Sequence, residues 1–66
     1  MDIQLNGKPT SVAAGITIGD LVRQKKLDPT TVVVEHNLAI VTAAELDRIT
    51  LKEKDALEIL RFVGGG

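Results

Sequence analysis

The residues that could most clearly take part in a reaction are the last three, Gly64, Gly65 and Gly66, which follow a segment typical of a β-strand. Three glycines without any Cβ atom form a thin, extensible thread that can enter a narrow tunnel. A terminal α-carboxyl group has a pKa of about 3.5 and is ionised at neutral pH. Such a carboxylate can attack the α-phosphate of ATP, and a sulfur nucleophile can then displace the acyl adenylate. A passive terminus or a cloning remnant is the alternative interpretation.

Elsewhere the sequence offers little catalytic chemistry. It contains no cysteine, and therefore no thiol nucleophile or soft metal ligand, and His36 alone makes no zinc site. We predict that His36 is a solvated residue on a hairpin turn. Asp2, Glu35 and Glu58 could be paired carboxylates, but nothing places them around a cavity, so general acid–base catalysis has no support. We therefore expect no catalytic residue and no metal site, and a protein that other enzymes act upon.

Length and composition limit the class of protein. A chain of 66 residues is one domain and buries only about 60% of the surface of its unfolded form, which leaves little room for a deep substrate cavity. The hydrophobic fraction of 44% and the charged fraction of 26% are typical of a compact domain. The net charge of -1, with scattered basic residues, argues against nucleic-acid binding. Without a membrane span or a signal peptide, a cytoplasmic protein is expected.

The N-terminal half predicts a hairpin followed by a helix. Apolar and polar residues alternate over residues 2–5, and Asn6-Gly7 is typical of a two-residue turn, so a second strand is expected over residues 8–12. Pro9 places that second strand at a sheet edge. Thr17 and the acidic residue three positions later form a capping-box pattern, which predicts a short helix over residues 18–26.

The C-terminal half predicts three further strands. β-Branched residues fill residues 31–35, a turn is expected at 36–37, and a short strand follows over 38–41. Residues 42–50 show no sustained period and allow a helical turn over the core edge, whereas 56–63 is typical of a last strand. The predicted fold class is α+β, with a small mixed sheet of four to five strands and one main helix on one face. Residues 1–63 form the domain and residues 64–66 a flexible tail.

The last strand has a consequence for binding, because side chains alternate between the two faces of a sheet. If Leu57 and Ile59 face the helix, Leu60 and Phe62 lie on the uncovered face. These two residues form either a small cluster under a loop or a patch that binds a partner, and we favour the patch.

Several short motifs occur in a fixed order along the whole chain. They are Ile3-x-Leu5-Asn6-Gly7, Thr17-Ile18-x-x-Leu21, Val32-x-Val34-Glu35-x-Asn37, Ile40-Val41, Asp55 with Leu57-Glu58-Ile59, and Phe62-Val63-Gly64-Gly65-Gly66. Together these motifs resemble the ThiS family of thiamin-biosynthesis sulfur carriers. The resemblance implies the ubiquitin-like β-grasp fold, in which the first and last strands lie side by side at the sheet centre. Thr42 and Lys54 depart from the family pattern, in which proline and glycine are frequent, and both lie in turns.

The resemblance also implies the reaction and its partners. Gly66 would be adenylated by an E1-like, ThiF-type enzyme that uses ATP and Mg²⁺, and would become a thiocarboxylate with sulfur from a cysteine desulfurase. A ThiG-type thiazole synthase would accept the sulfur. Gly64 and Gly65 would thread into the partner, while Leu60, Phe62 and Val63 would dock the base of the tail. The chain would be a monomer when free, would bind no cofactor itself and would contact neither nucleic acid nor membrane.

Other functions fit the same tail. The small subunit of molybdopterin synthase shares the fold and the glycine-ended mechanism, although its members tend to be longer. A sulfur carrier for cysteine or tRNA thiolation, or a ubiquitin-like protein conjugated to lysines, differs only in the acceptor. A β-grasp interaction module with passive glycines belongs to another class, and in that case deletion of Gly65 and Gly66 would leave its activity intact.

Overall fold

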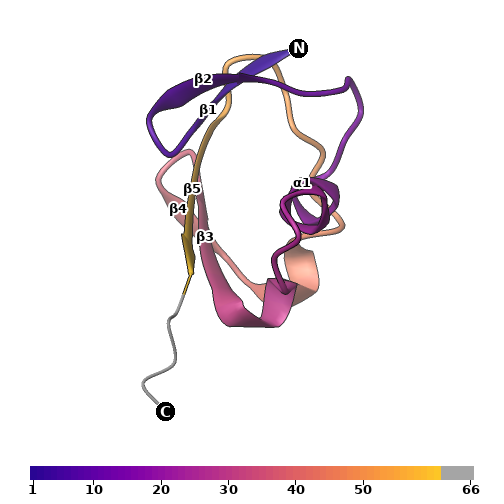
Figure 1. The fold of residues 1–66 in the computed structure, drawn as a ribbon, viewed down its shortest axis with the longest axis vertical. Helices are drawn as coiled ribbons and strands as arrows, with labels where there is room; N and C mark the ends of the chain where they lie inside the picture. Colours follow the sequence, from indigo (N-terminus) through magenta and orange to yellow (C-terminus); the bar gives the residue numbers. More distant parts are fainter. Residues whose placement is uncertain (62–66) are drawn as a thin grey trace.

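The computed structural model describes residues 1–61. Within this part of the chain, five strands form one mixed sheet in the order β2-β1-β5-β3-β4, and a single α-helix, α1, lies against one face (Figure 1). The predicted α+β class is confirmed. The elements are β1 Asp2–Leu5, β2 Lys8–Ser11, α1 Ile18–Gln24, the 3₁₀ helix η1 Pro29–Thr31, β3 Val32–His36, β4 Ala39–Val41, the 3₁₀ helix η2 Ala43–Glu45, and β5 Ala56–Arg61.

The first and last strands meet at the centre of the sheet, as the resemblance implied. β5 is parallel to β1, with Leu5 opposite Leu57, and antiparallel to β3 on its other side. β2, which contains Pro9, is an edge strand, as predicted. β5 is therefore held between two neighbouring strands, and it is the last element of the described part of the chain (Figure 1).

Two asparagine turns connect the hairpins. Asn6 and Gly7 have φ angles of 51° and 79°, the left-handed pair that a type I′ turn needs, so the first predicted hairpin is confirmed. The second turn lies at Asn37 and Leu38, with φ angles of 50° and 74°, one residue later than expected. As a result His36 is the last residue of β3, and the prediction of a solvated turn histidine is wrong.

The helix begins as the sequence predicts and ends earlier. The Thr17 hydroxyl accepts from the Asp20 amide, and the Asp20 carboxylate accepts from the Thr17 amide, both at 3.1 Å. At the other end, Lys26 has a φ of 59°, and the Leu27 amide donates to the Val22 carbonyl at 3.1 Å. This Schellman-type ending stops α1 at Gln24, two residues before the expected end. A lysine occupies the position where glycine is the usual signal.

The segment 42–50 secures the start of α1. It forms the single turn η2 and then runs past the helix N-terminus. The carbonyls of Leu46 and Ile49 accept from the Gly19 and Ile18 amides at 2.9 and 3.0 Å, and so satisfy helix donors that have no partner inside the helix. None of the helices in residues 1–61 is long and apolar enough to cross a membrane.

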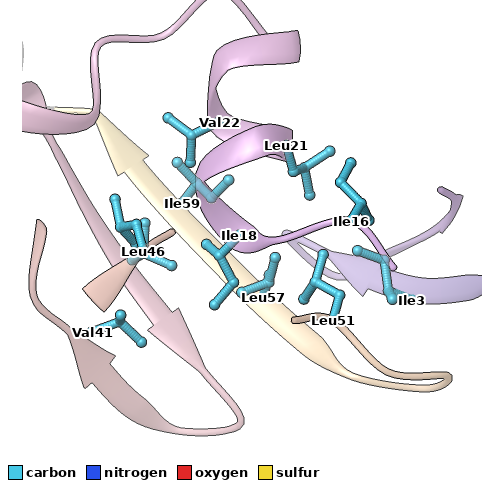
Figure 2. Packing of buried hydrophobic residues seen from close by; sticks show 11 residues of the cluster. Ile3, Ile16, Ile18, Leu21, Val22, Val41, Leu46, Leu51, Leu57 and Ile59 are labelled. Atoms are coloured by element: carbon cyan, nitrogen blue, oxygen red, sulfur yellow. The ribbon is translucent and has the colours of Figure 1, made fainter. Parts of the chain in front are cut away.

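The core lies between α1 and the sheet, where Figure 2 shows the side chains of α1 beside Leu57 and Ile59 of β5. Leu57 is 1% exposed and Ile59 is 8% exposed, which confirms that this face of β5 points to the helix. Segments without regular structure also contribute aliphatic side chains. The buried cluster consists of Ile3, Ile16, Ile18, Leu21, Val22, Val34, Val41, Leu46, Leu51, Leu57 and Ile59.

Candidate functional site

Of the residues predicted to react or to dock, the structure places one. Leu60 lies on the sheet face opposite α1 and is 61% exposed, as the alternation of β5 predicted. Phe62, Val63 and the tail residues Gly64, Gly65 and Gly66 lie outside the described residues. The site is therefore built from the end of β5 and its neighbouring strands.

Leu60 belongs to an apolar surface that we call the outer patch, consisting of Val33, Ile40 and Leu60. Val33 of β3 is directly opposite Leu60, and Ile40 of β4 is 71% exposed and pairs with Glu35, two residues along β3 from Val33. Cross-strand neighbours and diagonal neighbours on one face are within reach of each other. Exposed apolar surface of this kind is typical of protein–protein contacts.

The turn beside β4 adds an exposed leucine. Leu38 is 92% exposed, and its φ of 74° is one that a side chain with Cβ seldom adopts. Sequence analysis did not single out Leu38 or Ile40, because residues 38–41 read simply as a short apolar strand. In the structure Ile40 lies opposite Glu35. The sequence could have indicated this pairing only if the turn had been predicted at residues 37–38, one residue later than it was.

Two carboxylates lie directly opposite one another on the same face, Glu35 in β3 and Glu58 in β5. Like charges in this position destabilise a sheet. We expect Glu58→Gln to raise the free energy of unfolding in urea by about 0.2–1 kcal/mol. Glu35→Gln should give a similar gain, and the double variant little more, because either change alone removes the repulsion. A lower free energy of unfolding for Glu58→Gln would contradict this account.

Two asparagine side chains hold the backbone of β5. At its start, Asn37 Oδ1 accepts from the backbone amide of Ala56, and the backbone amide of Asn37 donates to the Ala56 carbonyl, both at 2.8 Å. Further along, Asn6 Oδ1 accepts from the Ile59 amide at 2.7 Å, and Asn6 Nδ2 donates to the Ile59 carbonyl at 3.4 Å. Both asparagines are therefore more than turn residues, which the sequence pattern alone did not indicate.

A buried carboxylate organises the start of β5. Asp55 is 8% exposed; its Oδ2 accepts from the Lys52 amide at 2.9 Å and lies 2.8 Å from His36 Nε2. Its Oδ1 accepts from Asn37 Nδ2 at 3.1 Å. Burial raises the pKa of Asp55, but the hydrogen bonds from His36, the Lys52 amide and Asn37 outweigh burial and leave the pKa below its usual value.

The position of the Asp55 network indicates a structural role. It lies at the start of β5, whereas the C-terminal residues follow the other end of the strand. His36 and Asp55 form one hydrogen-bonded pair, and residues 1–61 contain no group of three or more side chains that could hold a metal ion.

Comparison with known proteins gives a consistent result. The ThiS family model matches residues 3–66. The chain is 37% identical over 65 residues to the sulfur carrier protein ThiS of Bacillus subtilis, covering 97% of this chain and 98% of that protein. It is 38% identical over 66 residues to a thiazole synthase of Magnetococcus marinus, and 33% identical to one of Paramagnetospirillum magneticum. All of this chain aligns with each thiazole synthase but spans only 20% of its length.

Solved structures agree with the sequence relatives. A crystal structure of the thiamine biosynthesis protein ThiS from Geobacter metallireducens has 35% identity and a TM-score of 0.83, with all of both chains covered. The solution structure of a thiamine biosynthesis protein from the same organism gives a TM-score of 0.84, covering all of this chain and 88% of that one. The β-grasp arrangement expected from the sequence is therefore confirmed.

Proposed function

The chain belongs to the ThiS family, and from this we propose that it is a sulfur carrier protein of thiamin biosynthesis. The observation that carries the proposal is the match to the Bacillus subtilis sulfur carrier over nearly the full length of both chains. The carrier proposal makes this chain a substrate of its partner enzymes and assigns it no catalytic residue. On this proposal catalysis belongs to the partners.

The reaction proceeds at the Gly66 carboxylate. An E1-like activating enzyme binds ATP and Mg²⁺, and a carboxylate oxygen attacks the α-phosphorus, with pyrophosphate as the leaving group. The terminal sulfur of a persulfide, charged by a cysteine desulfurase, attacks the carbonyl carbon, and AMP leaves with the electron pair of the C–O bond. A second thiol then reduces the resulting acyl disulfide and releases the thiocarboxylate. Because this chain has no cysteine, partner proteins supply both thiols.

The outer patch docks the carrier on its partners. We expect Leu60→Ser to weaken binding to the activating enzyme by about 10- to 100-fold, because a leucine buried in an interface contributes roughly 1.5–3 kcal/mol. The melting temperature should change little, because Leu60 is 61% exposed in the free protein. Isothermal titration calorimetry measures the affinity. Gln24→Ser, on the exposed end of α1 in the other layer, is the control and should bind as the wild type does.

Docking through Leu60 would be contradicted if Leu60→Ser bound at wild-type affinity. It would also be contradicted if Leu60→Ser lost stability without losing affinity. Phe62 and Val63 continue from β5 and extend the proposed docking surface toward Gly64 and Gly65, which thread into the partner.

The proposed sulfur acceptor is thiazole synthase. Two proteins named thiazole synthase each contain a stretch that aligns with this whole chain, so a carrier-like segment and the remaining four-fifths share one polypeptide there. This co-occurrence favours thiazole synthase over the molybdopterin, cysteine and tRNA acceptors. A β-grasp module with passive glycines is the alternative from another class.

Reconstitution tests the function. The purified 66-residue chain is incubated with an activating enzyme, ATP, Mg²⁺ and a sulfur donor, and the intact protein is weighed by mass spectrometry. The expected product is heavier by the difference between sulfur and oxygen. The Bacillus subtilis carrier in parallel shows that the partner enzymes are active. An unchanged mass beside a reacting control would exclude the carrier function. Transfer from the product to thiazole synthase, compared with molybdopterin synthase lacking its small subunit, identifies the acceptor.

A further inference from the structure

We propose that Asn6 is a positioning residue for the sulfur-loading reaction, because its side chain holds the end of β5, from which the reactive terminus continues. The inference rests on the proposed carrier function and adds a residue to it. Asn6 is distant from Gly66 in sequence, and the turn pattern accounts for its backbone conformation but not for what its side chain binds.

The sheet leaves the end of β5 with one neighbouring strand. β1 pairs with β5 only where Gln4 and Leu5 lie opposite Ala56 and Leu57. After Leu5 the chain turns at Asn6-Gly7 and leaves β5. On the other side, β3 remains paired with β5 up to Arg61. The β1 side of Ile59 therefore has no strand beside it.

The Asn6 side chain occupies this place. Its Oδ1 accepts from the Ile59 amide at 2.7 Å, its Nδ2 donates to the Ile59 carbonyl at 3.4 Å, and its own backbone amide donates to the Leu57 carbonyl at 2.8 Å. The pairing between β1 and β5 ends at Leu57, and the side chain of Asn6 adds hydrogen bonds to β5 two residues further on, at Ile59. An amide is suited to this role because it carries both a donor and an acceptor.

The backbone of the turn explains which replacements are informative. With a φ of 51°, Asn6 needs a residue that tolerates the left-handed region. Glycine tolerates it and removes both side-chain hydrogen bonds. Aspartate also visits this region and retains the acceptor for the Ile59 amide, but cannot donate to the Ile59 carbonyl.

Removal of the Asn6 side-chain amide should lower kcat and leave KM nearly unchanged. The outer patch consists of side chains of β3, β4 and β5, whereas the hydrogen bonds of Asn6 go to the backbone of Leu57 and Ile59, so we expect docking to be retained. After Leu57, β5 would then be held by β3 alone, and we expect a smaller fraction of docked carriers to place the Gly66 carboxylate against ATP. Because small misplacements of reacting atoms are costly, we expect kcat to fall about tenfold and KM to stay within about twofold.

The chain contains a matched control at the other end of the same strand. Asn37 has a φ of 50°; its Oδ1 accepts from the Ala56 amide, its backbone amide donates to the Ala56 carbonyl, and its Nδ2 donates to Asp55 Oδ1. Asn37→Gly therefore removes one side-chain hydrogen bond to the β5 backbone and one to Asp55, at the start of the strand and away from the end that leads to the tail. It should lower the melting temperature at least as much as Asn6→Gly and leave kcat unchanged.

The experiment compares the wild type with Asn6→Gly, Asn6→Asp and Asn37→Gly as substrates of the activating enzyme. Initial rates of thiocarboxylate formation are measured by intact mass over a range of carrier concentrations, after circular dichroism shows each variant to be folded at the assay temperature. We expect a tenfold lower kcat for Asn6→Gly, most of the rate restored in Asn6→Asp, and a wild-type kcat for Asn37→Gly. If Asn6→Gly is unfolded at the assay temperature, all four proteins are compared at a lower temperature at which Asn6→Gly is folded.

Two results would overturn the inference and leave the carrier function intact: a wild-type kcat in Asn6→Gly, or an equal fall of kcat in Asn6→Gly and Asn37→Gly. The second result would mean that Asn6 contributes only to stability. If the wild type itself gains no sulfur while a known carrier does, both the carrier function and the role of Asn6 are rejected. Faster hydrogen exchange of the Ile59 amide in Asn6→Gly than in Asn37→Gly gives an independent measure of the hydrogen bond to Asn6.

Discussion

We expect deletion of Gly65 and Gly66 to abolish thiocarboxylate formation and to leave the melting temperature unchanged. An extended chain spans about 3.3–3.6 Å per residue, so the deletion withdraws the carboxylate by about 7 Å. Reacting atoms must come within about 3–3.5 Å, and a misplacement of about 1 Å can cost a factor of about 100 in rate. The product should therefore be undetectable by intact-mass measurement. The buried cluster consists of isoleucine, leucine and valine side chains, which the two deleted glycines lack, so the fold should persist.

A second variant tests whether the position of the terminal carboxylate matters when no residue is lost. Addition of one alanine after Gly66 keeps every residue of the chain but displaces the carboxylate beyond the adenylation site, and we expect the same loss of reaction. Both variants should still bind the activating enzyme, because the outer patch is intact. Undiminished thiocarboxylate formation in either variant would contradict a reactive Gly66. A cellular activity that survives the deletion would favour the passive interaction module.

The parts of the fold that the sequence predicts well are those decided by local chemistry. Asn6-Gly7 fixes a two-residue turn, Thr17 and Asp20 form the predicted capping box, and the alternation along β5 separates its buried face from its exposed face. The two errors have a common cause. Lys26 and Leu38 adopt left-handed conformations where glycine or asparagine would be the usual signal, so the local pattern does not mark the end of α1 or the second residue of the turn.

The candidate site divides in the same way. The exposure of Leu60 follows from the period of two along a strand. The hydrogen bonds between Asn6 and Ile59 join residues 53 positions apart, and those between His36 and Asp55 join residues 19 apart. No local pattern marks such pairs, because they are created by the strand order of the sheet.

The Asp55 network should contribute the largest single polar term to stability. Three groups lose their acceptor in Asp55→Ala: the Lys52 amide, Asn37 Nδ2 and His36 Nε2. Leaving a fully buried donor without a partner costs roughly 1–3 kcal/mol; these three donors are only partly buried and water can reach them, so we expect a total loss of about 3 kcal/mol in urea unfolding. Asp28→Ala removes an exposed carboxylate from the cap of η1 and should cost less. If both variants lost the same free energy of unfolding, the burial of Asp55 would not explain its contribution to stability.

The pH dependence distinguishes the charge of Asp55 from its shape. The pKa of Asp55 lies below its usual value in the folded protein, so the unfolded chain takes up a proton first as the pH falls. The stabilisation by the carboxylate is therefore complete above the unfolded pKa of about 3.9 and is lost as the pH falls through the lower folded pKa. Asp55→Asn, which carries no such charge, should be less stable than the wild type near neutral pH, and the difference should narrow at acid pH. Asp20, whose pKa is also lowered, is common to both proteins and cancels in this comparison. A gap that stays constant down to the most acid pH at which both proteins remain folded would mean that the hydrogen-bonding shape of Asp55 matters and its charge does not.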